Sequence, residues 1–265
     1  MIKKKLYLII RKLVLIYLFI FPGKLKFRLS PNLNFKIIDL NNYERNKNLI
    51  FKKDFFKKEN NSVIYNYDFI NLCNNLGGKR GIDIAKFGIF KWYEKNKFKA
   101  NMVWDSKQSA KRILNLIYNY DFINSISTKA DEYRLKKILK ININAFYKFT
   151  FTKKVSEYSL LELKVHILIK YILKEEIEYI KNTFETILEA QVDSFSMHKT
   201  YNILEQANFI NDINEIINML LNFNKEVPEI FSLTKIKMET VLAQYFHKDG
   251  TLALFNGTNN SDLEK

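Results

Sequence analysis

The sequence predicts a mainly α-helical protein, arranged as an array of stacked helical hairpins that ends in a short β segment. Apolar residues recur at spacings of three and four over most of the chain after Tyr65, which is the period of a helix with one buried face. The 265 residues include only 7 glycines and 3 prolines, too few for the many turns of a β fold. The apolar fraction of 47% is large enough to build a sizeable core.

Residues 1–24 predict a basic amphipathic helix that ends at Pro22 and Gly23. Its longest uninterrupted apolar run, 13–21, is too short to span a bilayer, which needs about 20 residues. No cleavage site of a signal peptide follows this run. The helix can lie on an anionic membrane surface or pack on the domain, and the sequence does not decide between a cytoplasmic and an envelope-associated protein.

The rest of the chain predicts a series of helices after short extended pieces in residues 24–64. The expected helices cover about 67–76, 79–96, 106–120, 130–149, 156–173, 175–192, 198–223 and 228–246. Candidate N-caps are Asp105 or Ser106 for the third helix and Ser156 or Ser159 for the fifth. The sixth helix would carry acidic residues in its first turn, which suits the helix dipole, and Pro228 would start the last helix.

The core-facing sides of two helices can be read from their apolar spacing. In the helix over 79–96 the residues expected on or near one face are Ile84, Phe87, Phe90 and Trp92. In the helix over 106–120 they are Ala110, Ile113, Leu114 and Ile117.

The heptapeptide YNYDFIN occurs twice, at residues 65–71 and 118–124. One explanation is a repeated unit of two helices. The other is coincidence in a chain that is rich in Asn, Tyr and Ile, since the flanking residues match poorly. The sequence alone leaves both explanations open.

The net charge of +15 is concentrated in residues 1–60, which hold 15 lysines and arginines against 4 acidic residues. Such a segment attracts polyanions, namely acidic polysaccharide, anionic lipid or nucleic acid. The alternative explanation is an AT-rich genome, which enriches Lys, Asn and Ile together. The sequence holds no RNA-binding, zinc-finger or recognition-helix pattern, so it predicts no nucleic-acid partner.

Cysteine and histidine give no sign of a metal site or a cofactor. Cys73, the single cysteine, is expected to be an inert structural thiol. The three histidines, His166, His198 and His247, lie far apart in the sequence, and no cofactor motif accompanies them. We expect His166 to lie in the core or in a groove, and we expect neither a metal nor a cofactor.

After the last expected helix the sequence has a turn and a strand-like run, DGTLALFNG, followed by the polar tail TNNSDLEK. A single strand cannot satisfy its own backbone groups, and no other strong strand lies nearby in the sequence. This run is therefore expected to lead into a second domain that the chain does not contain.

Five stretches, in this order along the chain, carry a resemblance to a known family: NYDFINLCNNLGG, IFKWYEKN, VWDSKQSAKRILNLIYNYDFI, LEAQVDSFSMHKTYNILEQANFINDI and YFHKDGTLALFNG. Together they resemble bacterial heparinase II/III-like proteins, especially the alphaproteobacterial branch. The last stretch is similar, almost residue for residue, to the family's junction between its two domains. The resemblance covers roughly residues 1–257.

The resemblance implies an α/α toroid followed by an antiparallel β domain. On this basis residues 25–247 would form an incomplete α/α toroid, and residues 248–265 would be the junction to the absent C-terminal β domain. The characterised relatives are polysaccharide lyases of the EC 4.2.2 type, which cleave anionic, uronate-containing chains by β-elimination. In these lyases a base removes the proton at C5 of the uronate while its carboxylate is neutralised nearby. We expect no full lyase activity from this chain without the β domain.

The family's motif Gln-Ile/Val-x-x-Asp-Gly-x-His is only partly kept in residues 191–200. Asp193 matches the motif's aspartate, whereas Ser194 and Ser196 stand at its glycine and histidine. His198 lies two residues beyond the histidine position, and Lys199 keeps the basic residue that follows in the family.

The tyrosine that serves as base and acid in such lyases falls on Ile203, two residues after Tyr201. On a helix a shift of two residues turns a side chain by about 200°, so a loop or irregular first turn would be needed to bring Tyr201 into place. A plainer interpretation makes His198 and Lys199 solvated residues and Tyr201 a packing residue. The resemblance predicts Tyr201 and His198 as catalytic residues and Lys199, Asp193, Trp104 and Arg112 as substrate-binding residues, with no metal.

Three functions are consistent with the sequence. The first is the N-terminal half of a heparinase II/III-like lyase that acts on an anionic polysaccharide. The second is a non-catalytic polysaccharide-binding or envelope-associated scaffold protein of the same fold, which the broken motif favours. The third is a peripheral membrane protein that uses residues 1–24 as an anchor in the plane of the membrane.

Overall fold

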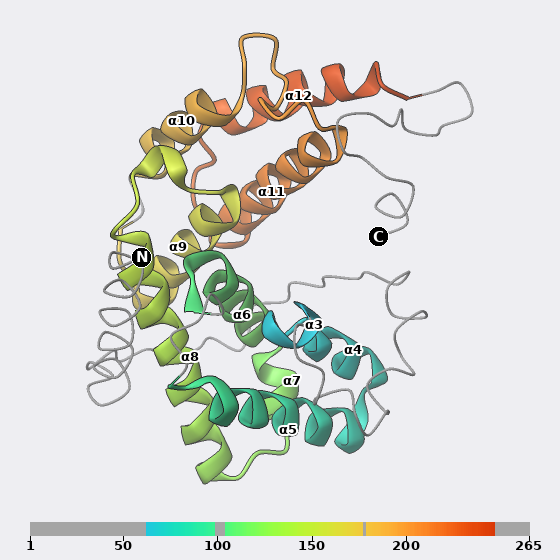
Figure 1. Cartoon of the computed structure of the whole chain (residues 1–265), viewed down its shortest axis with the longest axis vertical. Helices are drawn as coiled ribbons and strands as arrows, with labels where there is room; N and C mark the ends of the chain where they lie inside the picture. The colour runs from blue at the N-terminus through green and yellow to red at the C-terminus, as the bar shows by residue number, and fades with distance from the viewer. Residues whose placement is uncertain (1–61, 99–103, 177–178, 247–265) are drawn as a thin grey trace, which may run out of the picture. The chain divides into compact units, whose positions relative to one another are not determined.

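The computed structural model describes residues 62–98, 104–176 and 179–246 (Figure 1). Helices account for most of these residues, which confirms the predicted mainly α-helical class. Where the chain is described, β structure is limited to isolated bridges such as the antiparallel pair Val192 and His198. The predicted N-terminal helix, the extended pieces before residue 62 and the C-terminal junction lie outside the described residues. The chain divides into two compact units, Met1–Thr152 and Lys153–Lys265.

The first unit contains the described helices α3 (Ser62–Tyr65), α4 (Phe69–Leu76), α5 (Gly78–Asn96), α6 (Ser106–Tyr118), α7 (Tyr120–Asn124) and α8 (Lys129–Thr150). Helix α6 packs along α8, and α4 packs on α5 (Figure 1). The predicted inner face of α6 is confirmed, since Ala110, Ile113, Leu114 and Ile117 are all buried. Asp105 caps α6 by accepting a hydrogen bond from the backbone N–H of Gln108.

The predicted inner face of α5 is confirmed at Trp92 and wrong at Phe87, while Ile84 and Phe90 are half-buried. The buried apolar residues of this helix are Ile82, Ala85, Ile89, Trp92 and Tyr93, while Phe87 is exposed. Small residues explain the choice of face, because α5 also buries Gly81 and Gly88, where neighbouring backbone can come close. The spacing of the large apolar residues alone therefore does not define the buried face of α5.

A seam of asparagine side chains joins the first copy of the YNYDFIN heptapeptide to α6. The Nδ2 of Asn115 donates to Asp68 Oδ1 at 2.9 Å, and the Nδ2 of Asn71 donates to Asn115 Oδ1 at 3.1 Å. One turn further on, the Nδ2 of Asn119 donates to Asn71 Oδ1 at 2.9 Å. Both copies of the heptapeptide span a break between two helices, α3 to α4 and α6 to α7.

The second unit contains a 3-10 turn η3 (Val155–Glu157) and the described helices α9 (Leu160–Leu173), α10 (Ile180–Gln191), α11 (Ile203–Asn222) and α12 (Glu229–Ala243). Helix α11 packs against α12, and α9 packs against both α10 and α11 (Figure 1). The buried rings of Phe184 and Phe231 stack with centroids 4.0 Å apart and bring α10 to α12. The buried ammonium group of Lys164 on α9 bridges Asp212 and Glu215 on α11.

The starts of three helices differ in how well the sequence predicted them. Ser159 caps α9 in a capping box with Glu162, as expected for one of the two candidates, whereas Ser156 lies in η3. Helix α10 starts at Ile180, so its first turn contains no acidic residue and the predicted start at residue 175 is wrong. Helix α11 starts at Ile203 rather than at His198, and Asn202 is its N-cap.

None of the helices within the described residues is long and apolar enough to cross a membrane.

Candidate functional site

The segment between α10 and α11, which we call the 192–202 loop, carries four of the six predicted site residues. It is a narrow hairpin closed by hydrogen bonds from the backbone N–H of Asp193 to the carbonyl of Met197 at 2.9 Å and from the N–H of Lys199 to the carbonyl of Gln191 at 2.8 Å. Asp193, His198, Lys199 and Tyr201 are therefore brought together on one short piece of chain. Trp104 and Arg112, by contrast, belong to the first unit.

Asp193 shapes the turn of the loop. Its Oδ1 accepts hydrogen bonds at 2.9 Å from the backbone N–H of Phe195 and at 2.9 Å from that of Met197. An aspartate that bonds to backbone two residues on is typical of a tight turn. Ser196, at the family's histidine position, has a φ of 64°, a left-handed conformation that few side chains adopt. The structure therefore gives Asp193 a role in loop geometry.

His198 lies half-buried at the end of the hairpin. Its Nδ1 is 2.8 Å from Thr200 Oγ1, and its ring contacts Phe209 of α11 with centroids 5.6 Å apart. Partial burial lowers the pKa of His198 below its usual 6.5, although nearby Glu205 opposes the shift. His198 therefore presents a neutral imidazole near neutral pH.

Lys199 and Tyr201 flank His198 on the exposed side of the loop. The ammonium group of Lys199 donates to the backbone carbonyl of Glu189 at 2.6 Å, so its charge lies beside the end of α10. Tyr201 is 50% exposed and has a φ of 53°, in a turn where its N–H donates to the carbonyl of His198 at 2.7 Å. Tyr201 thus precedes α11 instead of lying on its far face.

Ile203 occupies the position of the family's tyrosine and is fully buried as the first residue of α11. No phenol can act at that position. Any tyrosine chemistry in the loop would have to come from Tyr201, two residues earlier and outside the helix.

Arg112 and Trp104 are both 0% exposed in the core of the first unit. The guanidinium of Arg112 lies 4.5 Å from the ring centroid of Trp92 and 5.1 Å from that of Trp104. It donates to Asn142 Oδ1 at 2.7 Å, to the carbonyl of Tyr65 at 2.9 Å and to Ser109 Oγ at 3.1 Å. Burial lowers the pKa of Arg112 to about 10, so it stays charged at neutral pH. Because both side chains are fully buried, neither can contact a saccharide directly.

Two further residues, one in the loop and one in α11, belong to this site although the sequence did not identify them. Phe195 stands at its tip with 80% of its side chain exposed, and an exposed aromatic face can stack on a sugar ring. Gln206 of α11 is fully buried and holds the loop, since its Oε1 accepts from the N–H of His198 at 2.7 Å. Its Nε2 donates to the carbonyl of Ser196 at 3.0 Å and to that of Met238 at 3.1 Å. Neither residue belongs to a recognisable motif, so no local signal in the sequence identifies them.

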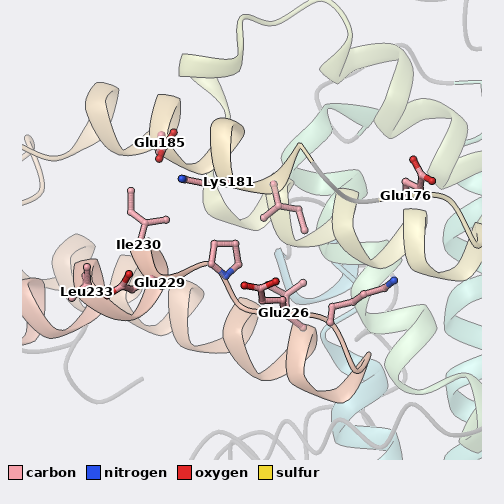
Figure 2. A pocket seen from close by; sticks show the side chains of 11 residues that line it. Glu176, Lys181, Glu185, Glu226, Glu229, Ile230 and Leu233 are labelled. Atoms are coloured by element: carbon pink, nitrogen blue, oxygen red, sulfur yellow. The ribbon is translucent and has the colours of Figure 1, made fainter.

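A groove of about 890 Å³ lies elsewhere in the second unit, between α10, the α11–α12 connection and the start of α12 (Figure 2). Glu185 and Lys181 border it from α10, and Glu229 and Ile230 border it from α12 (Figure 2). Four glutamates and two lysines line it in all, so its net charge is negative. None of the predicted site residues lines this groove, and its charge does not suit an anionic saccharide.

The described residues hold no group of three or more His, Cys, Asp or Glu side chains that could bind a metal ion.

Comparisons with known proteins support the fold. No family model matches the chain, and no curated protein matches it. Among solved structures, the chain is similar to the heparan sulfate lyase HepC from Pedobacter heparinus, with a TM-score of 0.52 and 13% sequence identity. The match covers 92% of this chain and 45% of HepC, so the chain spans less than half of that protein's length. The chain therefore has a helical fold like that of a heparinase-type lyase.

Proposed function

We propose that this helical domain is the substrate-binding half of a polysaccharide lyase that acts on anionic, uronate-containing chains by β-elimination. The observation that carries the proposal is the similarity of 92% of the chain to part of a heparan sulfate lyase. The family resemblance of the 192–202 loop and the basic charge of the chain support it. In this proposal residues 25–247 form the helical half, and residues 248–265 lead to a C-terminal β domain. We also propose that the basic residues 1–24 contact an anionic membrane surface.

The loop supplies the groups that β-elimination needs. The deprotonated hydroxyl of Tyr201, a phenolate, is the base that takes the C5 proton, and the C5–H electrons form the C4–C5 double bond as the C4–O bond breaks. The phenol formed in this way then gives its proton to the departing glycosidic oxygen, which restores the phenolate. Lys199 neutralises the uronate carboxylate and the neutral ring of His198 donates a hydrogen bond to it, which favours the enolate-like charge in the transition state. Asp193 holds the turn that presents them.

Lyase activity can be tested by following the ultraviolet absorbance of unsaturated uronate products from heparan sulfate. We expect no product from this chain alone and product when a C-terminal β domain of a related lyase is supplied. Tyr201→Phe, which removes only the hydroxyl, should then abolish activity. Product formation by this chain alone would contradict the two-domain proposal, and full activity of Tyr201→Phe would exclude Tyr201 as the base.

A second candidate is a non-catalytic polysaccharide-binding or envelope-associated scaffold protein with the same fold. The burial of Ile203 at the position of the family's tyrosine favours it, because the chemistry would be lost while the loop is kept. In this case the full chain would bind oligouronates without making product, and Tyr201→Phe would bind as tightly as the wild type.

A further inference from the structure

Thr200 holds the Nδ1 side of the His198 ring with two of its own groups. Its Oγ1 lies 2.8 Å from Nδ1, and its backbone N–H donates to the same nitrogen at 3.4 Å. The Oγ1 also accepts a hydrogen bond from the backbone N–H of Asn202 at 3.3 Å. The other ring nitrogen, Nε2, makes no hydrogen bond to the described residues.

The donors and acceptors around Nδ1 can all be satisfied in one way only. A backbone N–H can only donate, so Nδ1 must accept from Thr200 N–H and cannot itself carry a proton there. The hydroxyl of Thr200 then donates to Nδ1 while its oxygen accepts from Asn202 N–H. The opposite tautomer would set the N–H of Nδ1 against the N–H of Thr200.

We infer that Thr200 fixes neutral His198 as the Nε2–H tautomer, so that His198 meets a ligand as a hydrogen-bond donor. Thr200 is therefore a positioning residue that acts through His198. Under the proposed function, on which this role rests, an Nε2–H group suits a uronate carboxylate. A neutral ring with its proton on Nε2 cannot be the base, which leaves that role to Tyr201.

Two further contacts position His198, one at its ring and one at its backbone. Phe209 packs against the ring from α11, and the buried amide of Gln206 binds both the backbone N–H of His198 and the carbonyl of Ser196. Because both come from the first two turns of α11, the helix sets the position of His198 and Thr200 sets its tautomer.

The tautomer can be measured by 15N NMR of the imidazole rings in the full chain at a pH above the titration of His198. Only three histidines are present, and His198→Gln assigns the signal by its loss. We expect an unprotonated Nδ1 and a protonated Nε2 in the wild type. Thr200→Val, which keeps the shape but not the hydroxyl, should give a mixture of tautomers, and Thr200→Ser should restore the single form.

A protonated Nδ1 in the wild type, or a Thr200→Val spectrum identical to the wild type, would overturn the inference. This readout needs no saccharide, so it can succeed even if the proposed function fails.

Titration with a heparan sulfate oligosaccharide tests separately whether the Nε2–H of His198 binds the ligand. We expect the Nε2 signal to shift and Thr200→Val to weaken binding by about threefold to tenfold. No shift of Nε2 at saturation would remove His198 from the binding site while leaving its tautomer assigned.

Discussion

At the scale of single residues, Arg112 shows how a charged side chain can serve the core. Its guanidinium is buried between Trp92 and Trp104 and donates to three neutral acceptors, with no carboxylate at ion-pair distance among the described residues. The planar guanidinium can stack on the tryptophan rings and carries N–H donors in fixed directions, so arginine suits this buried position better than lysine.

Replacing Arg112 should destabilise the first unit strongly. Arg112→Met removes the donor from two fully buried side-chain acceptors, Asn142 Oδ1 and Ser109 Oγ, and each loss costs about 1–3 kcal/mol. We expect the free energy of unfolding to fall by about 3 kcal/mol or more, and Arg112→Lys should recover little of it. Urea unfolding followed by tryptophan fluorescence reports this unit directly, because the two tryptophans of the chain both contact Arg112.

Arg134→Met is the matched control for that experiment. Arg134 lies over the ring of Phe90 and pairs with Glu94 on the surface, where such pairs are worth about 1 kcal/mol or less. Equal losses from both variants would show that the buried position of Arg112 confers no special stability.

The sequence could not reveal the burial of Arg112 or Trp104. A basic and an aromatic residue near a polar segment suit a saccharide site by residue type alone. The buried position of Arg112 depends on Asn142 and Tyr65, which lie 30 and 47 positions away in the sequence. In the 192–202 loop the resemblance did select residues that the structure brings together, because that loop is held largely by local hydrogen bonds.

At the scale of helices, local capping signals were predictable, whereas starts and faces set by distant packing were not. Asp105, Ser159 and Pro228 each stand at the start of a helix because their effect comes from neighbouring residues. The start of α10 and the inner face of α5 depend on partners elsewhere in the fold. On α5 the buried face is set by the small residues Gly81 and Gly88, where neighbouring backbone can come close.

Gly81→Ala should disrupt the packing of α4 on α5. A Cβ at this position would lie 2.4 Å from the backbone carbonyl oxygen of Cys73, which cannot move without shifting α4. We expect the free energy of unfolding to fall by about 1–3 kcal/mol, measured by urea denaturation. Lys79→Ala, at an exposed position on the same helix, should change it little. A stable Gly81→Ala variant with unshifted α4 resonances would show that this contact is looser than described.

At the scale of the whole molecule, stability should depend on pH through His166. Burial lowers the pKa of His166 to about 4, and its ring stacks on Tyr158 with centroids 5.7 Å apart. Between pH 4 and the usual 6.5 the unfolded chain binds more protons at this residue than the folded chain. The free energy of unfolding should therefore fall as the pH drops through this window.

The contribution of His166 can be isolated with His166→Gln. Urea unfolding of both proteins at a series of pH values should give a shallower slope for the variant, by up to about 1.4 kcal/mol per pH unit. Superimposable pH profiles would contradict the lowered pKa of His166. His198 contributes in the same direction in both proteins and does not affect the comparison.

We propose a uronate-binding site on the 192–202 loop of this heparinase-like helical fold. Isothermal titration calorimetry of the full chain with a heparan sulfate oligosaccharide at low ionic strength tests this claim most directly. We predict that the double variant His198→Gln, Lys199→Gln weakens binding by at least about tenfold, or 1.4 kcal/mol, while Lys181→Gln, Lys225→Gln in the acidic groove binds like the wild type. Unchanged binding by the loop variant, with loss in the groove variant, would contradict the claim.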